Sequence, residues 1–156
     1  MIHIRTADLD DIAVIKQLME ENDLNPERIE DSISNCMIAW DNRTPIAAAG
    51  FIDNENSALL QFIVVQKARQ RESIGDGILK SLLNFADAKG IRDVFVYTKN
   101  ELAPFFKKVG FQEANPDQIH TAAKRFHIDF QGENDIWLHV ALPEFFKTAC
   151  RAKQHQ

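Results

Sequence analysis

The sequence has few of the features that mark metal-binding, disulfide-bonded or membrane-bound proteins. Among its 156 residues are two cysteines, Cys36 and Cys150, and neither belongs to a Cys-x-x-Cys motif or a compact Cys/His cluster. This pattern argues against a zinc site and predicts reduced, structural thiols. No apolar run approaches the roughly 18 residues of a membrane span or secretory signal. We therefore expect a cytoplasmic protein that holds no metal and does not enter a membrane.

A surplus of basic residues is also missing. Lys and Arg together number 18 against 23 Asp and Glu, and the formal net charge is -5 at pH 7. Nucleic-acid-binding proteins need a basic face that neutralises phosphates. The charge therefore argues against nucleic acid and favours a small-molecule or protein partner.

The length and the apolar content of 45% predict one globular domain with an ordinary core. We expect that domain over residues 1–145. A helical or frayed tail is expected over residues 146–156, where the pattern becomes polar.

The chain does contain a succession of short strand and helix patterns. Strands are expected where apolar and polar residues alternate, or where β-branched residues form a continuous run typical of a strand buried on both faces. Helices are expected where apolar residues recur every three or four positions. The expected strands cover residues 2–4, 37–40, 46–52, 59–65, 94–97 and 136–142. The expected helices cover residues 8–19, 26–33, 74–89, 102–109 and the chain from 143 onward.

Three residues predict the ends of these helices. Asn25 is expected to cap the second helix and Pro26 to occupy its first position, where a missing N–H group does no harm. Gly90 is expected to end the third helix. Residues 114–133 have no clean period, so no element is expected there.

The loop after the buried run at residues 59–65 has the composition of an anion-binding site. Three cations lie close together in it: Lys67, Arg69 and Arg71. The small residues Ser73 and Gly75 follow at the start of an amphipathic helix, whose first amides lack intrahelical acceptors and attract phosphate. We predict that the backbone amides between Gln70 and Asp76 hold a pyrophosphate. Solvated loop charges before an ordinary helix are the alternative.

The order of these residues resembles the acetyl-CoA motif of the GNAT N-acetyltransferase superfamily. That motif is a Gln or Arg, two residues, a Gly, any residue, and a Gly or Ala. Residues 70–75, Gln-Arg-Glu-Ser-Ile-Gly, match it with Ser73 at the usual first glycine, and Lys67 stands where a proline is common upstream. A serine keeps the amide donor and adds a hydroxyl donor.

A second block supports the resemblance. Residues 103–111, Ala-Pro-Phe-Phe-Lys-Lys-Val-Gly-Phe, are similar to the family's later signature of an aromatic pair, three residues and Gly-Phe. Residues 4–12 resemble its first strand and helix. Three blocks in order are more specific than one glycine-containing loop. The pattern covers about residues 2–113 and is nearest to amino-acid N-acetyltransferases and the acetyltransferase-like domain of citrate lyase ligases.

The resemblance implies a GNAT fold, which is an α/β (α+β) architecture. Its central twisted sheet is mixed but mostly antiparallel, with six to seven strands and about four flanking helices. Acetyl-CoA is the implied co-substrate, a small-molecule amine the implied acceptor, and a homodimer the implied assembly. In this family the fourth and fifth strands splay, and backbone groups of the fourth strand pair with the pantetheine arm. The implied cofactor contacts are Ile63, Val64, Val65, Gln70, Arg71, Glu72, Ser73, Ile74, Gly75, Asp76, Asn100 and Phe106.

The catalytic groups are the weakest part of the resemblance. Many family members have a tyrosine acid at the position of Phe106, and phenylalanine cannot donate a proton. The candidates that remain are Gln61, the polar residue of the expected fourth strand, and Asn100, which follows the fifth. Asn100 has the alternative role of a helix cap before Glu101. The leaving thiolate either departs unassisted, or another group or water assists it, or the chain only binds acyl-CoA.

Acceptor-side residues have two interpretations. The acidic stretch at residues 20–31 either walls a site for a cationic amine, as the family's first helix loop does, or is a solvated helical face. His120, His127 and Asp129 fit no metal-ligand spacing. The leading function is therefore acetylation of a small, amino-acid-like amine. Acetylation of a protein and non-catalytic binding or sensing of acyl-CoA are the alternatives.

Overall fold

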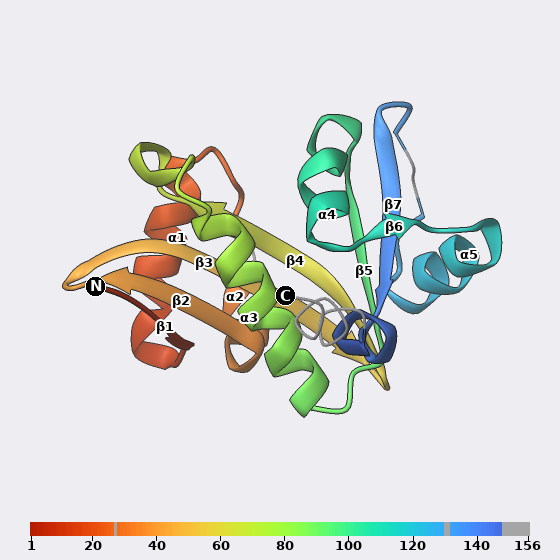
Figure 1. Ribbon diagram of the computed structural model, residues 1–156, viewed down its shortest axis with the longest axis horizontal. Helices are drawn as coiled ribbons and strands as arrows, with labels where there is room; N and C mark the ends of the chain where they lie inside the picture. The colour runs from red at the N-terminus through yellow and green to blue at the C-terminus, as the bar shows by residue number, and fades with distance from the viewer. Residues whose placement is uncertain (27, 130–131, 148–156) are drawn as a thin grey trace. The chain divides into compact units, whose positions relative to one another are not determined.

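The computed structural model describes residues 1–26, 28–129 and 132–147 (Figure 1). Its seven-stranded sheet has the order β1-β2-β3-β4-β5-β7-β6. Neighbouring strands are mostly antiparallel, and β4 with β5 is a parallel pair, so the predicted fold class is confirmed. The strands are β1 (Ile2–Thr6), β2 (Cys36–Asp41), β3 (Thr44–Asn54), β4 (Ser57–Val65), β5 (Asp93–Lys99), β6 (Gln112–Glu113) and β7 (Asp135–Ala141). The α-helices are α1 (Ile12–Glu21), α2 (Ile29–Ser32), α3 (Ile74–Ala88), α4 (Ala103–Val109) and α5 (Pro116–Arg125), and residues 142–147 are also helical.

The chain forms two compact units whose boundaries lie within β3, β4 and α3. The first unit combines the described residues of Met1–Ile52 with Leu60–Ala86, and the second combines Asp53–Leu59 with the described residues after Ala86. The expectation of a single domain over residues 1–145 stays a prediction. Of the expected tail, residues 148–156 lie outside the described residues.

Both faces of the sheet in the first unit are covered by helices, as side-chain alternation along its strands requires. Cys36, Ile38, Phe62 and Val64 point to one face and belong to one buried cluster with residues of α1 and α2. Phe51 points to the other face, where its ring lies 6.2 Å from Phe85 of α3. The apolar stripe of α3 is fully buried, and burying each such side chain contributes about 1.5–3 kcal/mol.

Close packing in this unit limits side-chain size at one strand position. Gly50 of β3 is paired with Cys36 of β2. A Cβ atom added to Gly50 would lie 2.5 Å from the Cys36 sulfur and 2.8 Å from a ring carbon of Phe62. The Cys36 thiol is fully buried and donates a 3.3 Å hydrogen bond to the Ser32 carbonyl. The prediction of a reduced, structural thiol therefore fits Cys36, whereas Cys150 lies outside the described residues.

An ion pair between Arg5 and Asp11 holds the helical turn that leads into α1. Arg5 donates two hydrogen bonds to Asp11, at 2.7 and 2.9 Å, and the Asp11 side chain is 6% exposed. Asp11 also accepts from the Asp8 amide, and Asp8 accepts from the Asp10 amide. These contacts fix the chain between β1 and α1.

The second unit is built on the antiparallel pair β5 and β7, which runs from Asp93 opposite Ala141 to Lys99 opposite Asp135. The parallel ladder between β4 and β5 joins Ser57–Leu59 to Asp93–Phe95. Gly110 ends α4 with a φ of 138°, a conformation that favours glycine.

Two helix predictions differ from the structure. The second helix begins at Ile29 rather than at Pro26, because Arg28 in front of it adopts a left-handed φ of 64° that interrupts a helix. Helix α5 lies where no element was expected. Asn115 and Gln118 form a capping box at its start, a sequence signal that apolar periodicity does not detect.

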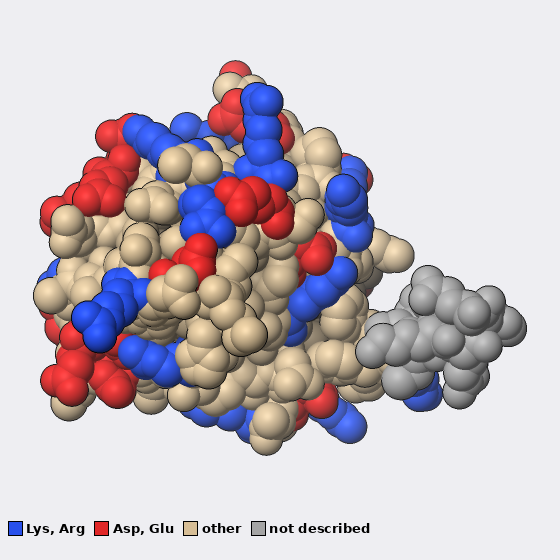
Figure 2. Space-filling model, turned by 60° about the vertical axis from the view of Figure 1, so that its left-hand side comes forward, with Lys and Arg blue, Asp and Glu red and all other residues tan. Residues whose placement is uncertain are grey.

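The surface carries both charge signs. Figure 2 shows Lys and Arg side chains interspersed with Asp and Glu on the face that it presents. None of the described helices is long and apolar enough to cross a membrane.

Candidate cofactor site

The expected cofactor loop leaves the end of β4 and leads into α3. Its first residues form the 3-10 turn η3 (Lys67–Arg69). The Gln66 amide donates to the Ile46 carbonyl at 2.8 Å, and the Arg69 amide donates to the Gln66 carbonyl at 2.8 Å. The loop therefore starts from a fixed point beside β3.

Ser73 ends the loop in a conformation that favours glycine. Its φ is 63°, in the left-handed region where most side chains are strained. Its carbonyl accepts from the Gly77 amide at 3.1 Å, which is the first turn of α3. The strain explains why an acetyl-CoA motif would have a glycine at this position.

The first amides of α3 have no side-chain partner in the described part of the chain. Within the described residues, no side-chain oxygen accepts a hydrogen bond from the amides of Ile74, Gly75 or Asp76. Such amides carry the positive end of the helix dipole and bind oxyanions. The predicted pyrophosphate position is thus not filled by a described side chain of the protein.

The three cations of the loop have different surroundings. Arg69 donates from Nη1 to Asp41 at 2.9 Å and from Nε to Glu72 at 2.8 Å. Lys67 lies 4.0 Å from Asp23. Arg71 is exposed and has no ion-pair partner in the part of the chain that the structure describes. Arg71 is therefore the cation of this loop best suited to meet an incoming phosphate.

Gln70 ties the loop to its surroundings. Its side-chain amide donates to the Val65 carbonyl at 3.1 Å and to the Asn22 side-chain oxygen at 3.4 Å. One backbone acceptor of the predicted pantetheine strand is thus already engaged. Along that strand, Val64 is buried, whereas Ile63 and Val65 are half-buried.

A family model described as an acetyltransferase (GNAT) domain matches residues 4–127. The chain belongs to the GNAT acetyltransferase family. This membership confirms the predicted family, its enzyme class of N-acetyltransferase and acetyl-CoA as the co-substrate of that class. No curated protein matches the chain in sequence.

Solved GNAT structures share the fold at low sequence identity. N-acetylglutamate synthase from Neisseria gonorrhoeae, solved with coenzyme A and N-acetyl-glutamate, is similar with a TM-score of 0.76 at 23% identity. The match covers 91% of this chain but 35% of that one, so the chain spans about a third of its length. The ribosomal-protein-S18-alanine N-acetyltransferase from Escherichia coli matches at 0.70 and 15% identity, over 91% of this chain and 94% of that one. The PaiA N-acetyltransferase from Thermoplasma acidophilum, solved with coenzyme A, matches at 0.66 and 16%, over 90% and 99%.

The GNAT signature residue Phe106 lies in the core of the second unit. Its side chain is 2% exposed, and its ring packs edge-to-face against Phe105 at 5.1 Å and Phe111 at 5.6 Å. The hydrophobic environment suits phenylalanine, which has no hydroxyl to satisfy.

The two candidate catalytic residues belong to different units. Gln61 of β4 is half-buried, and its side-chain oxygen accepts a 2.6 Å hydrogen bond from Ser32. Asn100 is exposed and is the first residue of the 3-10 turn η4 (Asn100–Leu102). Its amide donates to the Asn134 carbonyl at 2.7 Å, and its side chain makes no hydrogen bond to a described residue. Gln61 is thus fixed, whereas the Asn100 side chain is available to a ligand or a water.

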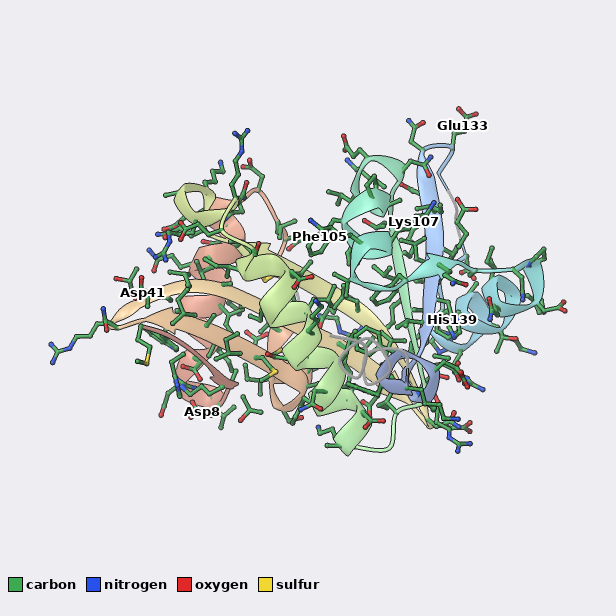
Figure 3. All side chains as sticks on the ribbon, viewed as in Figure 1. Asp8, Asp41, Phe105, Lys107, Glu133 and His139 are labelled. Carbon is green, nitrogen blue, oxygen red and sulfur yellow. The ribbon has the colours of Figure 1, made fainter. Side chains whose placement is uncertain are left out.

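Sequence reasoning missed two polar pairs on β5 and β7. Tyr97 donates to Asp135 at 2.7 Å, and burial, followed by this hydrogen bond, raises the pKa of Tyr97. His139, labelled in Figure 3, lies 2.7 Å from Asp93. The partners are 38 and 46 residues apart, so neither pair leaves a local sequence signal. Both pairs are also diagonal in the sheet, because Tyr97 lies opposite Trp137 and His139 lies opposite Phe95.

The acidic stretch and the histidines show no metal-ligand arrangement. Arg28 pairs with Asp31 at 3.2 Å, and Lys16 pairs with Glu30. Across the described ranges, no three His, Cys, Asp or Glu side chains are grouped to hold a metal ion.

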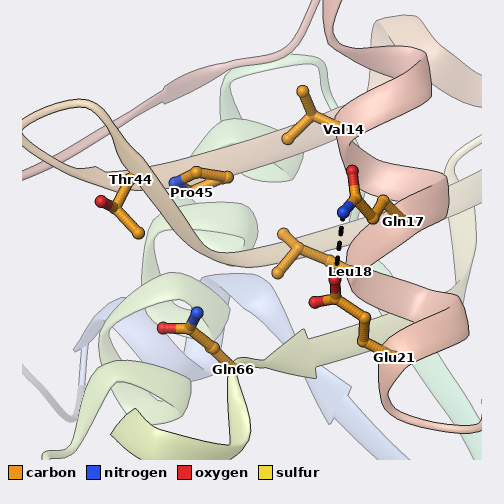
Figure 4. Close-up of a pocket in the computed structure, with 7 residues that line it drawn as sticks. All are labelled: Val14, Gln17, Leu18, Glu21, Thr44, Pro45 and Gln66. Carbon is orange, nitrogen blue, oxygen red and sulfur yellow. Dashed lines mark hydrogen bonds between the residues drawn. The ribbon is translucent and has the colours of Figure 1, made fainter.

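A shallow pocket of about 270 Å³ opens beside α1 (Figure 4). Val14, Leu18 and Pro45 give it an apolar floor. Gln17 and Glu21 stand at its rim and are joined by a 3.1 Å hydrogen bond, so the carboxylate is partly satisfied. The pocket has no buried polar group that would select a ligand.

Proposed function

We propose that the protein transfers the acetyl group of acetyl-CoA to the amine of a small, amino-acid-like acceptor. The observation that carries the proposal is the head of α3, where Ser73 holds a left-handed turn and the following amides are unpaired within the described residues. The motif position of residues 70–75 and the family match support the same assignment.

The acceptor class is supported by the relatives. The N-acetylglutamate synthase structure was solved with N-acetyl-glutamate, the product of acetylating an amino acid. We propose an amine carried by an amino-acid-like molecule because the strand and loop pattern matches enzymes of that type.

The proposed cofactor contacts are divided along the chain. Backbone groups of Ile63–Val65 pair with the pantetheine arm, and the amides of residues 70–76 hold the pyrophosphate. Arg71 supplies the positive charge, because Arg69 is already neutralised by Asp41 and Glu72. Asn100 and Phe106 stay predicted contacts of the cofactor, and Asn100 is the candidate for ordering a water.

The proposed reaction is direct attack in a ternary complex. The neutral amine forms a C–N bond with the thioester carbonyl, the C–S bond breaks, and the CoA thiolate leaves. The protonated amine has a pKa of ~10, so a water held by a polar side chain takes one proton from it before the attack, and a second proton leaves the nitrogen for solvent as the amide forms. The thiolate has a pKa of ~8.5 and leaves without a tyrosine acid. This route is compatible with phenylalanine at position 106.

A second candidate function is non-catalytic binding of acyl-CoA. It is favoured by the burial of Phe106 and by the engagement of Gln61 with Ser32, since neither can act as an acid. Acetylation of a protein amine is the third candidate. We further propose a cytoplasmic homodimer that does not act on nucleic acid, in keeping with the charge and the family.

Measurements of CoA binding and of acetyl transfer distinguish these three candidate functions. Calorimetry should detect CoA binding to the full chain, and free-thiol release from acetyl-CoA should rise with one member of an amino-acid and small-amine panel. Binding without turnover on either small amines or peptides would favour the sensor. Absence of CoA binding would remove all three functions.

A matched pair of variants tests the anion site. Arg71→Gln should weaken CoA binding about tenfold and reduce the salt dependence of binding. Arg43→Gln removes the same charge from an exposed turn of the same unit and should leave CoA binding unchanged. Equal effects of the two variants would indicate a general charge effect instead of a site.

A further inference from the structure

We propose that Asp41 is a positioning residue for the cofactor loop and acts through Arg69 without touching the cofactor. The inference rests on the proposed function for its effect on CoA, but its structural part can be tested without any ligand. It assigns different roles to two arginines that the sequence alone presents as equivalent.

The contact joins two segments that are far apart in the chain. Asp41 ends β2, and Arg69 ends the turn η3, 28 residues later. Arg69 Nη1 donates to one Asp41 oxygen at 2.9 Å, while the other Asp41 oxygen lies 3.2 Å from the ammonium group of Met1. Asp41 is labelled in Figure 3. The β2–β3 hairpin is therefore fastened to the loop by a charged side-chain bridge.

Arg69 is held from two sides. Its Nε donates to Glu72 at 2.8 Å, so its guanidinium spans the loop from η3 to the residue before Ser73. Its side chain is 24% exposed and that of Asp41 28%, which screens the bridge less than a fully solvated pair. Planar guanidinium groups hold carboxylates in fixed directions. The bridge therefore restricts the loop on both sides of Gln70.

The protonation states agree with this geometry. The hydrogen bond from Arg69, and then the Met1 ammonium, lower the pKa of Asp41. The hydrogen bonds to Glu72 and then to Asp41 raise the pKa of Arg69. Both partners are thus charged at neutral pH.

The loop needs such a restraint because one of its residues is strained. Ser73 keeps a φ of 63° only if its surroundings resist relaxation. Gln66 and Gln70 fasten the β4 side of the loop, whereas Arg69 fastens it to the hairpin and to Glu72. Without Asp41 the loop would sample more conformations, and the cofactor would have to order them on binding.

Five variants of the full chain test the assignment: Asp41→Asn, Arg69→Gln, the double variant of these two, Arg71→Gln, and Asp41→Asn combined with Arg71→Gln. Amide hydrogen exchange without ligand should show faster exchange in residues 67–73 for the first three and wild-type exchange for Arg71→Gln. CoA dissociation constants should rise about fivefold for Asp41→Asn and for Arg69→Gln, and by about the same factor in the double variant. Combining Asp41→Asn with Arg71→Gln should multiply the two single effects.

A purely structural role of Asp41 would change the thermal midpoint, whereas a positioning role changes the KM for acetyl-CoA. If Asp41 positions the loop, Asp41→Asn raises the KM for acetyl-CoA and leaves kcat and the thermal midpoint near wild type. Asp87→Asn, an exposed aspartate with no side-chain partner among the described residues, is the matched control and should change none of them. Unchanged exchange in residues 67–73, or independent effects of Asp41→Asn and Arg69→Gln, would overturn the proposal. Failure of the wild type to bind CoA would sink the proposed function while the exchange result still decides the bridge.

Discussion

Helices α3 and α5 begin in opposite ways. At α5, Asn115 accepts from the Gln118 amide at 2.8 Å, and Gln118 accepts from the Asn115 amide at 2.9 Å. At α3, the preceding residue is Ser73 in a left-handed turn, and no described side chain accepts from the next three amides. One helix start is satisfied by its own side chains, and the other has no side-chain acceptor among the described residues.

The two helix starts differ in what they contribute: the capped start of α5 adds stability, and the uncapped start of α3 belongs to the proposed site. A capping box stabilises a helix by satisfying amides that would otherwise need water. An open start loses that stabilisation, and Ser73 adds strain to it. Such a combination is typical of a binding site, where strain and unpaired donors coincide. The following variants make the two starts more alike or test what holds each in place.

Closing the α3 start should have the largest effect. Ser73→Asp places a carboxylate at the head of the helix, where it accepts from the free amides and repels phosphate. CoA affinity should fall about 100-fold, or about 2.7 kcal/mol, while the thermal midpoint stays the same or rises. Calorimetry and thermal denaturation check the two quantities. Ser73→Asn is the neutral control, and an equal loss of affinity in both variants would contradict the charge argument.

A third helix start, the turn before α1, is held by carboxylates. Its contribution to stability should therefore fall at acidic pH. The hydrogen bond from Arg5 lowers the pKa of Asp11, and the hydrogen bond from the Asp8 amide lowers it further by a smaller amount. A lowered folded pKa means that Asp11 stabilises the protein fully above its unfolded pKa of about 4 and loses this effect as pH falls through the folded value. Asp11→Asn should lower the free energy of unfolding at pH 7 by about 2 kcal/mol, after discounting for the 38% exposure of Arg5.

The same variant should also flatten the dependence of stability on pH below about 4. Urea denaturation between pH 2.5 and 7 measures this slope. A wild-type slope retained in Asp11→Asn would assign the acid sensitivity to other carboxylates. The amide cap of α5 gives the contrast, because Asn115 and Gln118 do not titrate.

Removing the N-terminal cap of α5 should have a moderate effect on stability. Asn115→Ala removes the cap and should lower the free energy of unfolding by about 1 kcal/mol. CoA binding should not change, since the α5 amides are not part of the proposed site. Asn115→Asp keeps an acceptor and should retain most of the stability. A loss of CoA affinity in Asn115→Ala would mean that α5 contributes to the cofactor site.

Relaxing Ser73 should have the smallest effect. Ser73→Gly removes left-handed strain of roughly 1 kcal/mol but gives the unfolded chain more freedom, so the net gain in stability should be a few tenths of a kcal/mol. CoA affinity should stay within about twofold, because the amide donors remain. Ser73→Ala keeps the strain and removes the hydroxyl. Weaker CoA binding in Ser73→Ala alone would reveal a hydroxyl contact to the cofactor.

The parts of the fold set by local pattern could be predicted from the sequence. The apolar stripe of α3, the buried run of β4 and the glycine at position 90 each act over a few residues, and the structure has all three. The start of α2 was mispredicted because Asn25 and Pro26 have the chemistry of a helix start, yet Arg28 turns left-handed after them. Helix α5 was missed because it has few apolar residues, although Asn115-Pro116 and Gln118 signal a start.

For the candidate site, the sequence predicts only what a contiguous motif carries. Residues 70–75 follow from a contiguous motif. The bridge from Arg69 to Asp41 could not be predicted, because it depends on which distant carboxylate the hairpin brings to the loop. The same is true of Tyr97 with Asp135. Side-chain pairing across the sheet requires the register, and sequence alone does not supply it.

The buried thiol of Cys36, beside Gly50, can serve as a chemical probe of how often the core of the first unit opens. Burial raises the pKa of Cys36 to about 11, so very little thiolate forms at neutral pH, and the sulfur is also shielded from reagents. An alkylating agent should therefore modify Cys36 only when the surrounding strands separate. The rate of its labelling, followed by mass spectrometry of the peptide that contains it, reports how often this core opens under native conditions.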